Sequence, residues 1–379
     1  MRLTNLLLLP VLILAACQPT ETYDILITNA TIYDGSGGAP VQGSIAINAD
    51  TIAAIGEVKG TGKTTYDAGG KAVAPGFINM LSWANVALIE DGRSLSDLKQ
   101  GVTLEVMGEG RSMGPLNEEM KTEMKENQSD IQYDISWTTL GEYLQFLENK
   151  GVATNFASFV GNGTLRQHVI GYENRPATPE EIEAMKELAA QAMAEGAVGL
   201  SSSLLYAPSR YASTAELIEL SKVASGYGGI YISHIRSEGE ELLESVQELI
   251  DIARGADIPA EIYHLKASGE RNWPKLDTVF AMIEAARDEG LAITADMYTY
   301  PASSTGLHTQ LPEWVREGGV EAALERMADP AQRDKILQDI EFEHGPDKIL
   351  LVGFRNPDLR QYQGKFLSEV AEALGKPAT

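Results

Sequence analysis

Two of the five histidines hold equivalent positions in two neighbouring segments of the chain. His234 ends the apolar run IYISH, and His264 ends the run EIYH, 30 residues later. If both runs are parallel strands, the two imidazoles lie at the same edge of a sheet, where neutral imidazole is a common zinc ligand. A single histidine of this kind would be better explained as a hydrogen-bonded loop residue. The paired placement favours a metal site.

A metal site needs a third ligand, and a carboxylate is the best candidate that the sequence offers. Glu109 follows the apolar run GVTLEVMG and is the best-placed acid, although a solvated loop acid is almost as good an interpretation. His168, His308 and His344 have no comparable placement, so we assign them no role.

Further polar residues are expected at the same edge. Arg236 and Lys266 each follow one of the two histidines by two residues. Two cations in an acidic chain suit the carboxylate of a substrate, but pairing of Arg236 with Glu238 and of Lys266 with Glu270 is about as reasonable. The other polar residues that follow predicted strands are Tyr206, Asp296, Tyr298 and Ser304.

The segments between these residues alternate between strand and helix. Predicted strands end at Ser202, His234, His264 and Asp296, at intervals of about 30 residues, which is the length of a strand–helix–strand unit. A helix is expected from Thr178, which begins a capping box with Glu181. The earlier runs AVAPGFINML, GVTLEVMGE and ATNFASFVG bring the number of strands to seven. This rhythm favours a (β/α)₈ barrel, with catalytic residues at the carboxyl ends of the strands. Residues 23–70 alternate as a small antiparallel β unit.

Composition sets limits on the partners. The chain has 379 residues, a net charge of −24, 44% hydrophobic and 22% charged residues. It is therefore a folded protein whose charge disfavours nucleic acid and anionic membrane surfaces. Its one cysteine, Cys17, excludes an internal disulfide.

The first 17 residues are typical of a targeting signal. MRLTNLLLLPVLILAAC has one arginine, an apolar run too short to span a bilayer, and the ending LAAC, which is similar to the bacterial lipobox. This resemblance implies lipidation at Cys17 after removal of a signal peptide. With Gln18 next, we expect a bacterial lipoprotein that faces the periplasm at the outer membrane, where the lipid anchor is the only membrane contact.

Several motifs in consecutive order resemble the N-acyl-D-amino-acid deacylases (D-aminoacylases) of the amidohydrolase superfamily. The strongest are YDILITNATIYDGSGGAP, KAVAPGFIN, the segment SSSLLYAPSRY through GGIYISHIRSEG, EIYHLKASG and ADMYTYPASSTGL. The resemblance implies a (β/α)₈ barrel with a small β-sandwich. It also implies hydrolysis of the amide of N-acyl-D-amino acids, with zinc to polarise the carbonyl and activate water.

The family's functional positions are only partly kept. His234 and His264 match its histidine ligands, Lys266 matches a lysine beside the second, and Tyr206, Tyr298 and Ser304 match positions near the substrate. The family's cysteine ligand is replaced in a segment that reads Gly108-Glu109-Gly110-Arg111. Its two first-strand histidines are replaced by Leu81 and Trp83, so the resemblance implies one zinc ion, held by His234, His264 and Glu109.

The end of the chain departs from the family as well. The family's general-base aspartate follows the eighth strand and would lie beyond Thr379. We therefore expect a barrel truncated before its eighth strand, a fragment of a longer reading frame. The expected regions are a signal peptide at 1–17, the β-sandwich portion at 18–71 and the incomplete barrel at 72–379.

The leading hypothesis for the activity is zinc-dependent hydrolysis of an N-acyl-amino acid to a carboxylate and a free amino acid. Two alternatives stay open. One is a barrel that binds acylated amino acids or peptidoglycan fragments without turning them over. The other is hydrolysis of a cyclic amide by the same reduced site.

Overall fold

The computed structural model describes residues 21–340, 342 and 344–378, and the chain divides into two compact units, Met1–Gly76 and Phe77–Thr379. The predicted signal peptide and its Cys17 lie outside the described residues, so the lipid anchor stays a prediction. Among the described helices, we find none that is both long enough and apolar enough to span a membrane.

The first unit is one mixed sheet of five strands. They are β1 (Thr22–Ile32), β2 (Val41–Asn48), β3 (Thr51–Gly56), β4 (Thr61–Asp67) and β5 (Ala72–Val73). β1, β2 and β3 pair antiparallel, whereas β4 and β5 pair with β1 in parallel. The alternating pattern thus predicted strands but not all their directions, because alternation reports which face is buried and not how strands pair. The sandwich itself stays a prediction.

The second unit is built on parallel strands that form two sheets, β6–β7–β8 and β9–β10–β11–β12–β13. Their bounds are β6 (Phe77–Asn79), β7 (Val102–Met107), β8 (Asn155–Ser158), β9 (Val160–Gly161), β10 (Gly199–Ser203), β11 (Ile230–His234), β12 (Ala260–Ile262) and β13 (Ile293–Ala295). Only Phe159 separates β8 from β9. Each of the seven predicted runs contains a strand, and the α/β class is confirmed.

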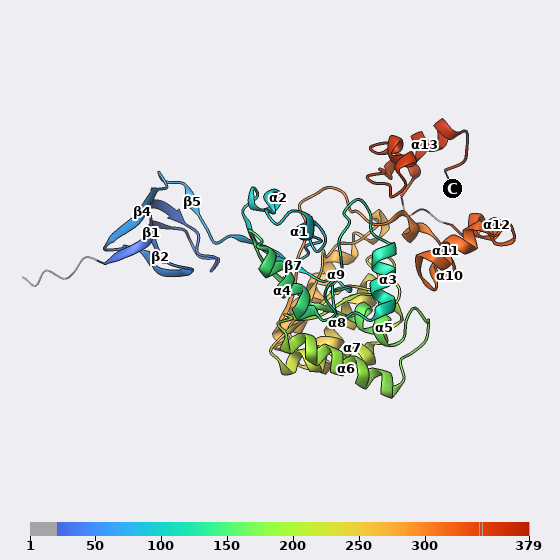
Figure 1. The fold of residues 1–379 in the computed structure, drawn as a ribbon, viewed down its shortest axis with the longest axis horizontal. Helices are drawn as coiled ribbons and strands as arrows, with labels where there is room; N and C mark the ends of the chain where they lie inside the picture. The colour runs from blue at the N-terminus through green and yellow to red at the C-terminus, as the bar shows by residue number, and fades with distance from the viewer. Residues whose placement is uncertain (1–20, 341, 343, 379) are drawn as a thin grey trace, which may run out of the picture. The chain divides into compact units, whose positions relative to one another are not determined.

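Helices follow the strands and surround them (Figure 1). They are α1 (Ala87–Glu90), α2 (Leu95–Leu98), α3 (Glu118–Glu126), α4 (Leu140–Lys150), α5 (Asn162–Val169), α6 (Pro179–Ala194), α7 (Thr214–Gly226), α8 (Leu242–Ala256), α9 (Lys275–Asp288), α10 (Glu313–Arg316), α11 (Gly319–Ala328), α12 (Pro330–Asp339) and α13 (Leu367–Leu374). Short 3₁₀ segments occur at Ser209–Tyr211, Glu270–Asn272, Leu307–Gln310, Pro346–Lys348 and Pro357–Tyr362.

The local signals for helix α6 act as predicted. The Thr178 side chain accepts from the Glu181 backbone, and the Glu181 side chain accepts from the Thr178 backbone. This reciprocal capping satisfies two backbone donors that the first helical turn leaves without partners. The helices then pack on the sheet, with Leu217 of α7 and Leu249 of α8 in one buried cluster with Leu200 of β10.

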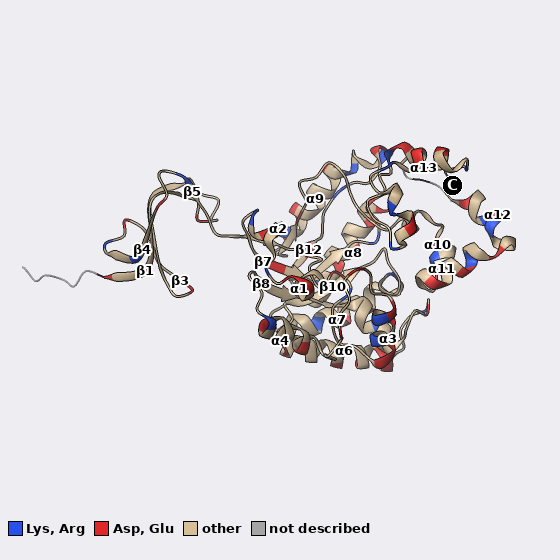
Figure 2. Ribbon diagram, turned by 45° about the horizontal axis from the view of Figure 1, so that its top comes forward, with Lys and Arg blue, Asp and Glu red and all other residues tan. Residues whose placement is uncertain are grey.

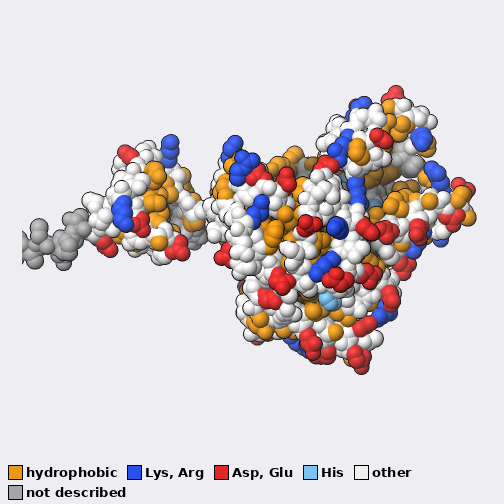
Figure 3. Space-filling model, viewed as in Figure 1, with side chains coloured by type: hydrophobic (Ala, Val, Ile, Leu, Met, Phe, Trp, Pro, Cys, Tyr) orange, Lys and Arg blue, Asp and Glu red, His pale blue; other side chains and the backbone are white. Residues whose placement is uncertain are grey.

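In the second unit, charged residues lie mainly on the helices around the strands, and the strands themselves carry few (Figure 2). Hydrophobic side chains also reach the surface of both units among acidic and basic ones (Figure 3). In the described part, β6 pairs only with β7, and β13 pairs only with β12. Closure of these strands into a barrel therefore stays a prediction.

Candidate metal centre and its cleft

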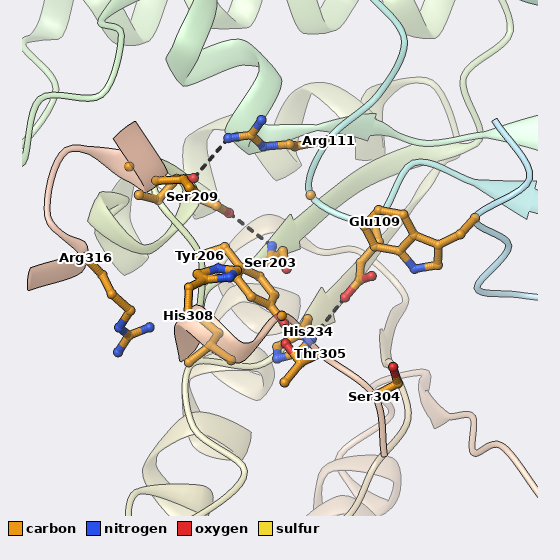
Figure 4. A pocket seen from close by; sticks show the side chains of 18 of the residues that line it. Glu109, Arg111, Ser203, Tyr206, Ser209, His234, Ser304, Thr305, His308 and Arg316 are labelled. Atoms are coloured by element: carbon orange, nitrogen blue, oxygen red, sulfur yellow. Dashed lines mark hydrogen bonds and ion pairs between the residues drawn. The ribbon is translucent and has the colours of Figure 1, made fainter. Parts of the chain in front are cut away.

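The three side chains predicted as metal ligands meet at the carboxyl ends of β7, β11 and β12. Oε1 of Glu109 lies 3.0 Å from Nδ1 of His234 and 3.6 Å from Nε2 of His264. All three residues are buried, and one ligand atom from each lies within 4.8 Å of the others. The Glu109 carboxylate points toward His234 in Figure 4. Among the described residues, this is the one group of acidic, histidine or cysteine side chains with metal-binding spacing.

The backbone on both sides of Glu109 is fixed by its surroundings. Gly108 and Gly110 have φ values of 99° and 60°, and a Cβ atom on Gly110 would stand 2.4 Å from the Cβ of Ser203. Only glycine fits such a position without strain. From β10, the Ser201 hydroxyl donates to the Gly108 carbonyl and accepts from the Gly110 amide at 3.0 Å. Ser201 thereby holds the turn that carries Glu109.

The two histidines reach the centre differently. His234 is the last residue of β11, so strand geometry aims its ring. His264 lies two residues beyond β12 and has a φ of 38°, which a residue with a Cβ rarely adopts. Its backbone N–H donates to Oδ1 of Asp296 at 2.6 Å. This bond from the segment after β13 stabilises the unusual conformation that turns the ring toward Glu109.

Glu238 and Lys266 support His264 from the side away from Glu109. Oε1 of Glu238 lies 2.9 Å from Nδ1 of His264 and 2.6 Å from Nζ of Lys266. The Lys266 ammonium also donates to the His264 carbonyl at 3.1 Å. When Nδ1 carries the proton that faces Glu238, Nε2 of His264 presents its lone pair to the centre. A carboxylate behind a histidine ligand is the usual support of a metal-binding imidazole.

The charges of the centre compensate one another. Burial would raise the pKa of Glu109, but hydrogen bonds with His234 and His264 outweigh it and lower this pKa to about 2. Burial would lower the pKa of His264, but hydrogen bonds with Glu109 and Glu238 raise it to about 9. Without a metal, a proton on His264 therefore supplies the positive charge that the two carboxylates require.

The centre lies in a cleft of about 3020 Å³. Four of the five residues predicted to contact the substrate line it, namely Tyr206, Lys266, Tyr298 and Ser304. The ring of Tyr206 lies 5.4 Å from that of His234, and the ring of Tyr298 lies 6.4 Å from that of His264. The Tyr206 hydroxyl is hydrogen-bonded to the hydroxyl of Thr305, at 2.7 Å. The three candidate metal ligands and these polar groups therefore face the same cleft.

Arg236, the fifth residue, takes a different position. Its guanidinium bonds Glu248 of α8 at 2.9 and 3.0 Å and donates to the carbonyls of Arg210 and Ala212. It is not among the described residues that line the cleft. The structure therefore does not support the expectation that Arg236 contacts the substrate, and Glu248, not Glu238, is its partner. The side chain of Lys266 pairs with Glu238 and not with Glu270.

Two histidines without a predicted role also line the cleft. His308 lies with its ring 6.4 Å from that of Tyr206, and His344 lies elsewhere along the lining. Sequence reasoning missed the roles of Glu238 and Ser201. Glu238 follows β11 by four residues, which is a signal for the correct edge of the sheet, but nothing local distinguishes Ser201 from its neighbours.

The positions that match the family's first-strand histidines hold apolar side chains. Leu81 is half-buried and packs against a buried cluster that includes Phe159 and Tyr263. Trp83 is 71% exposed. Both line the cleft, and neither side chain offers a metal ligand.

Comparison with known proteins identifies relatives of this chain. No family model matches the chain. A D-aminoacylase of Alcaligenes xylosoxydans xylosoxydans is 34% identical over 293 residues, which cover 76% of this chain and 60% of the relative. An N-acyl-D-glutamate deacylase and an N-acyl-D-aspartate deacylase of the same organism are 31% and 32% identical. The chain thus spans about 60% of the length of the curated relatives it matches.

Solved structures give the same result. A crystal structure of D-aminoacylase, described as defining a novel subset of amidohydrolases, has a TM-score of 0.74 at 28% identity and covers 94% of this chain and 68% of its own. An N-acyl-D-glutamate deacylase from Bordetella bronchiseptica, complexed with zinc and a phosphonate inhibitor, has a TM-score of 0.74 at 26% identity.

Fold and site define an α/β protein of the amidohydrolase superfamily with a candidate metal centre at the ends of its parallel strands. Within that superfamily, the chain is a homologue of the N-acyl-D-amino-acid deacylases, or D-aminoacylases. The resemblance predicted from its motifs is confirmed.

Proposed function

We propose that this protein hydrolyses the amide bond of an N-acyl amino acid of D configuration, with one zinc ion as cofactor. The observation that carries the proposal is the convergence of Glu109, His234 and His264 in a cleft shared with Lys266 and Tyr298. The names of the relatives support the substrate class, since one is a D-aminoacylase and the other two are deacylases of N-acyl-D-glutamate and N-acyl-D-aspartate.

The three side chains suit zinc. Zinc binds imidazole nitrogen and carboxylate oxygen at about 2.0–2.2 Å, so that ligand atoms in a tetrahedral site stand roughly 3.3–3.6 Å apart. The distances of 3.0 and 3.6 Å from Oε1 of Glu109 lie close to this spacing. A zinc ion held by these residues would act as a Lewis acid on the scissile carbonyl.

The other residues of the cleft would position the substrate. The Lys266 ammonium lies 3.1 Å from Nδ1 of His264, and its partner Glu238 keeps it there. A substrate carboxylate that approaches Lys266 would bring the adjacent amide toward the metal ligands. Tyr298 lies beside Lys266, with its ring 5.4 Å from Nζ, so it would orient the amino-acid half of the substrate.

The experiment measures metal content and amide hydrolysis together. The protein, expressed with zinc, should contain one ion per chain and release free amino acid from N-acetyl-D-amino acids faster than from their L forms. His264→Ala should lose both the ion and the activity. His168→Ala is the matched control, because His168 is not among the described residues that line the cleft. Hydrolysis that survives zinc removal would contradict the proposal.

A second candidate is a protein that binds acylated amino acids without turnover. It is favoured by Leu81 and Trp83, which replace two metal-binding positions of the family. Isothermal titration of the zinc-loaded protein with N-acetyl-D-amino acids separates the two. Tight binding with no released product would favour the binding protein, and product release would exclude it.

The proposal extends to the barrel fold and to the cellular location of the protein. We propose that the parallel strands from β6 to β13 belong to a (β/α)₈ barrel, supported by their order and direction. We also propose that Cys17 carries the lipid that anchors the protein, supported by the LAAC sequence. Cys17→Ser should then move the protein from the membrane fraction to the soluble fraction.

A further inference from the structure

One wall of the cleft is apolar where the family carries metal ligands. In the bent segment after β6, Ser82 is buried, while Leu81 and Trp83 line the cleft. The Ser82 backbone donates to the carbonyl of Val106 at 2.8 Å, and its hydroxyl donates to Glu105 at 2.8 Å. These two bonds fix the backbone between Leu81 and Trp83, and the side chains of both residues line the cleft.

Trp83 is the most exposed large hydrophobic side chain of the described chain, at 71%. A tryptophan left in water forfeits one of the largest hydrophobic gains available to a side chain, so exposure inside a concave site indicates a ligand surface. Met297 and Tyr300, which flank Tyr298, line the same cleft and are also exposed, at 50% and 68%. Trp83, Met297 and Tyr300 thus line the same cleft as Glu109, His234 and His264.

We propose that Leu81 and Trp83 bind the acyl chain of the substrate and select long-chain N-acyl amino acids. This inference rests on the proposed function. The amino-acid half is drawn to Lys266, on the β12 side of the centre. Ser82 ties Leu81 and Trp83 to β7, the strand that leads to Glu109, so they flank the opposite half of a substrate whose carbonyl lies at the metal ligands.

The test varies the two halves of the substrate separately. One series holds D-alanine and lengthens the acyl chain from acetyl through butanoyl and hexanoyl to octanoyl. The other holds the acetyl group and enlarges the side chain from D-alanine to D-leucine and D-phenylalanine. We expect kcat/KM to rise along the acyl series by up to about fourfold for each methylene that leaves water. Trp83→Ala should flatten the acyl series, and Trp83→Phe should restore most of the slope.

A binding measurement makes the inference independent of turnover. N-octanoyl-D-alanine should shift the tryptophan emission of the metal-free protein, and N-acetyl-D-alanine should not. The shift should vanish in Trp83→Phe, while the variant still binds the octanoyl compound in isothermal titration.

The failures of the two proposals are distinguishable. A flat acyl series with a steep side-chain series, or an acyl slope unchanged in Trp83→Ala, would overturn the inference and leave the hydrolase intact. No hydrolysis of any compound by the zinc-loaded wild type would refute the proposed function, and an emission shift with the octanoyl compound would still support the acyl site.

Discussion

Glu238 holds His264 from behind, with 2.9 Å between Oε1 of the carboxylate and Nδ1 of the imidazole. The same oxygen binds Nζ of Lys266 at 2.6 Å, so one carboxylate fixes a predicted metal ligand and a predicted substrate-binding cation. The orientation of the His264 ring therefore depends on Glu238, which is not one of the three candidate metal ligands.

Replacing this carboxylate should weaken the metal site without removing a ligand. Glu238→Gln loses the charge that supports His264, and such changes typically lower metal affinity by about 10–100-fold. Zinc competition against a chromophoric chelator measures the affinity. Glu240→Gln is the control, because Glu240 is exposed and pairs with Arg271 at the surface. Equal affinity of the two variants would refute the supporting role.

Ser201 should matter for the position of Glu109 as well as for stability. Ser201→Ala removes both bonds to the turn and leaves the buried Gly110 amide without its acceptor, at a cost of about 1–3 kcal/mol in the free energy of unfolding. Zinc affinity should fall with it. Ser225→Ala, which removes one hydrogen bond to the Asp257 carbonyl, should leave the zinc affinity unchanged. Urea unfolding and chelator competition measure the two effects, and unchanged zinc affinity in Ser201→Ala would contradict the positioning role.

A buried ion pair joins α5 to α7. Arg166 and Glu216 have almost no exposed side-chain surface and meet at 2.5 Å. Arg166→Ala should cost about 3–5 kcal/mol in the free energy of unfolding, because it leaves a buried carboxylate without its partner. Replacing both members, as Arg166→Met with Glu216→Leu, should recover much of this loss. The surface pair of Lys222 and Glu219 provides the comparison, at less than about 1 kcal/mol for Lys222→Ala. A loss in Arg166→Ala as small as that would refute the assignment.

The metal-free protein should lose stability at both ends of the pH range. His264, whose folded pKa of about 9 exceeds its usual value of 6.5, contributes stability that is complete below 6.5 and is lost as the pH rises through 9. Glu109, whose folded pKa of about 2 lies below 4.5, contributes stability that is lost as the pH falls from 4.5 toward 2. Thermal melts in the presence of a chelator should show a fall in melting temperature at both acidic and alkaline pH. His264→Gln should remove the fall at alkaline pH. A fall of equal size at alkaline pH in that variant would contradict the assignment.

The number of zinc ions per chain should depend on which side chains stand at positions 81 and 83. Elemental analysis should give one ion per chain in the wild type. Leu81→His combined with Trp83→His restores the family's pair of first-strand ligands and should raise the content toward two. The same pair of changes to Gln, which offers no imidazole, should leave it at one. Two ions in the wild type would contradict the expected single site.

The elements, and the edge of the sheet at which the chemistry lies, can be predicted from local sequence patterns. The cap at Thr178 and Glu181 and the regular spacing of strands are local properties, encoded within a few residues. His234 and His264 follow equivalent units, so strand direction places both at the same edge of the sheet, whereas the final orientation of the His264 ring depends on its contacts with Asp296 and Glu238. Those features were predictable because helix and strand periodicity depend on neighbours in sequence.

Which side chains touch depends on how the elements pack together. Arg236 and Lys266 follow their histidines at the same interval, yet Arg236 is drawn to Glu248 on α8 while Lys266 stays in the cleft with Glu238. Ser201 reaches a turn more than 90 residues away in sequence. Ion pairs and hydrogen bonds of this kind depend on which elements pack together and how far each side chain is buried, and no local pattern encodes that.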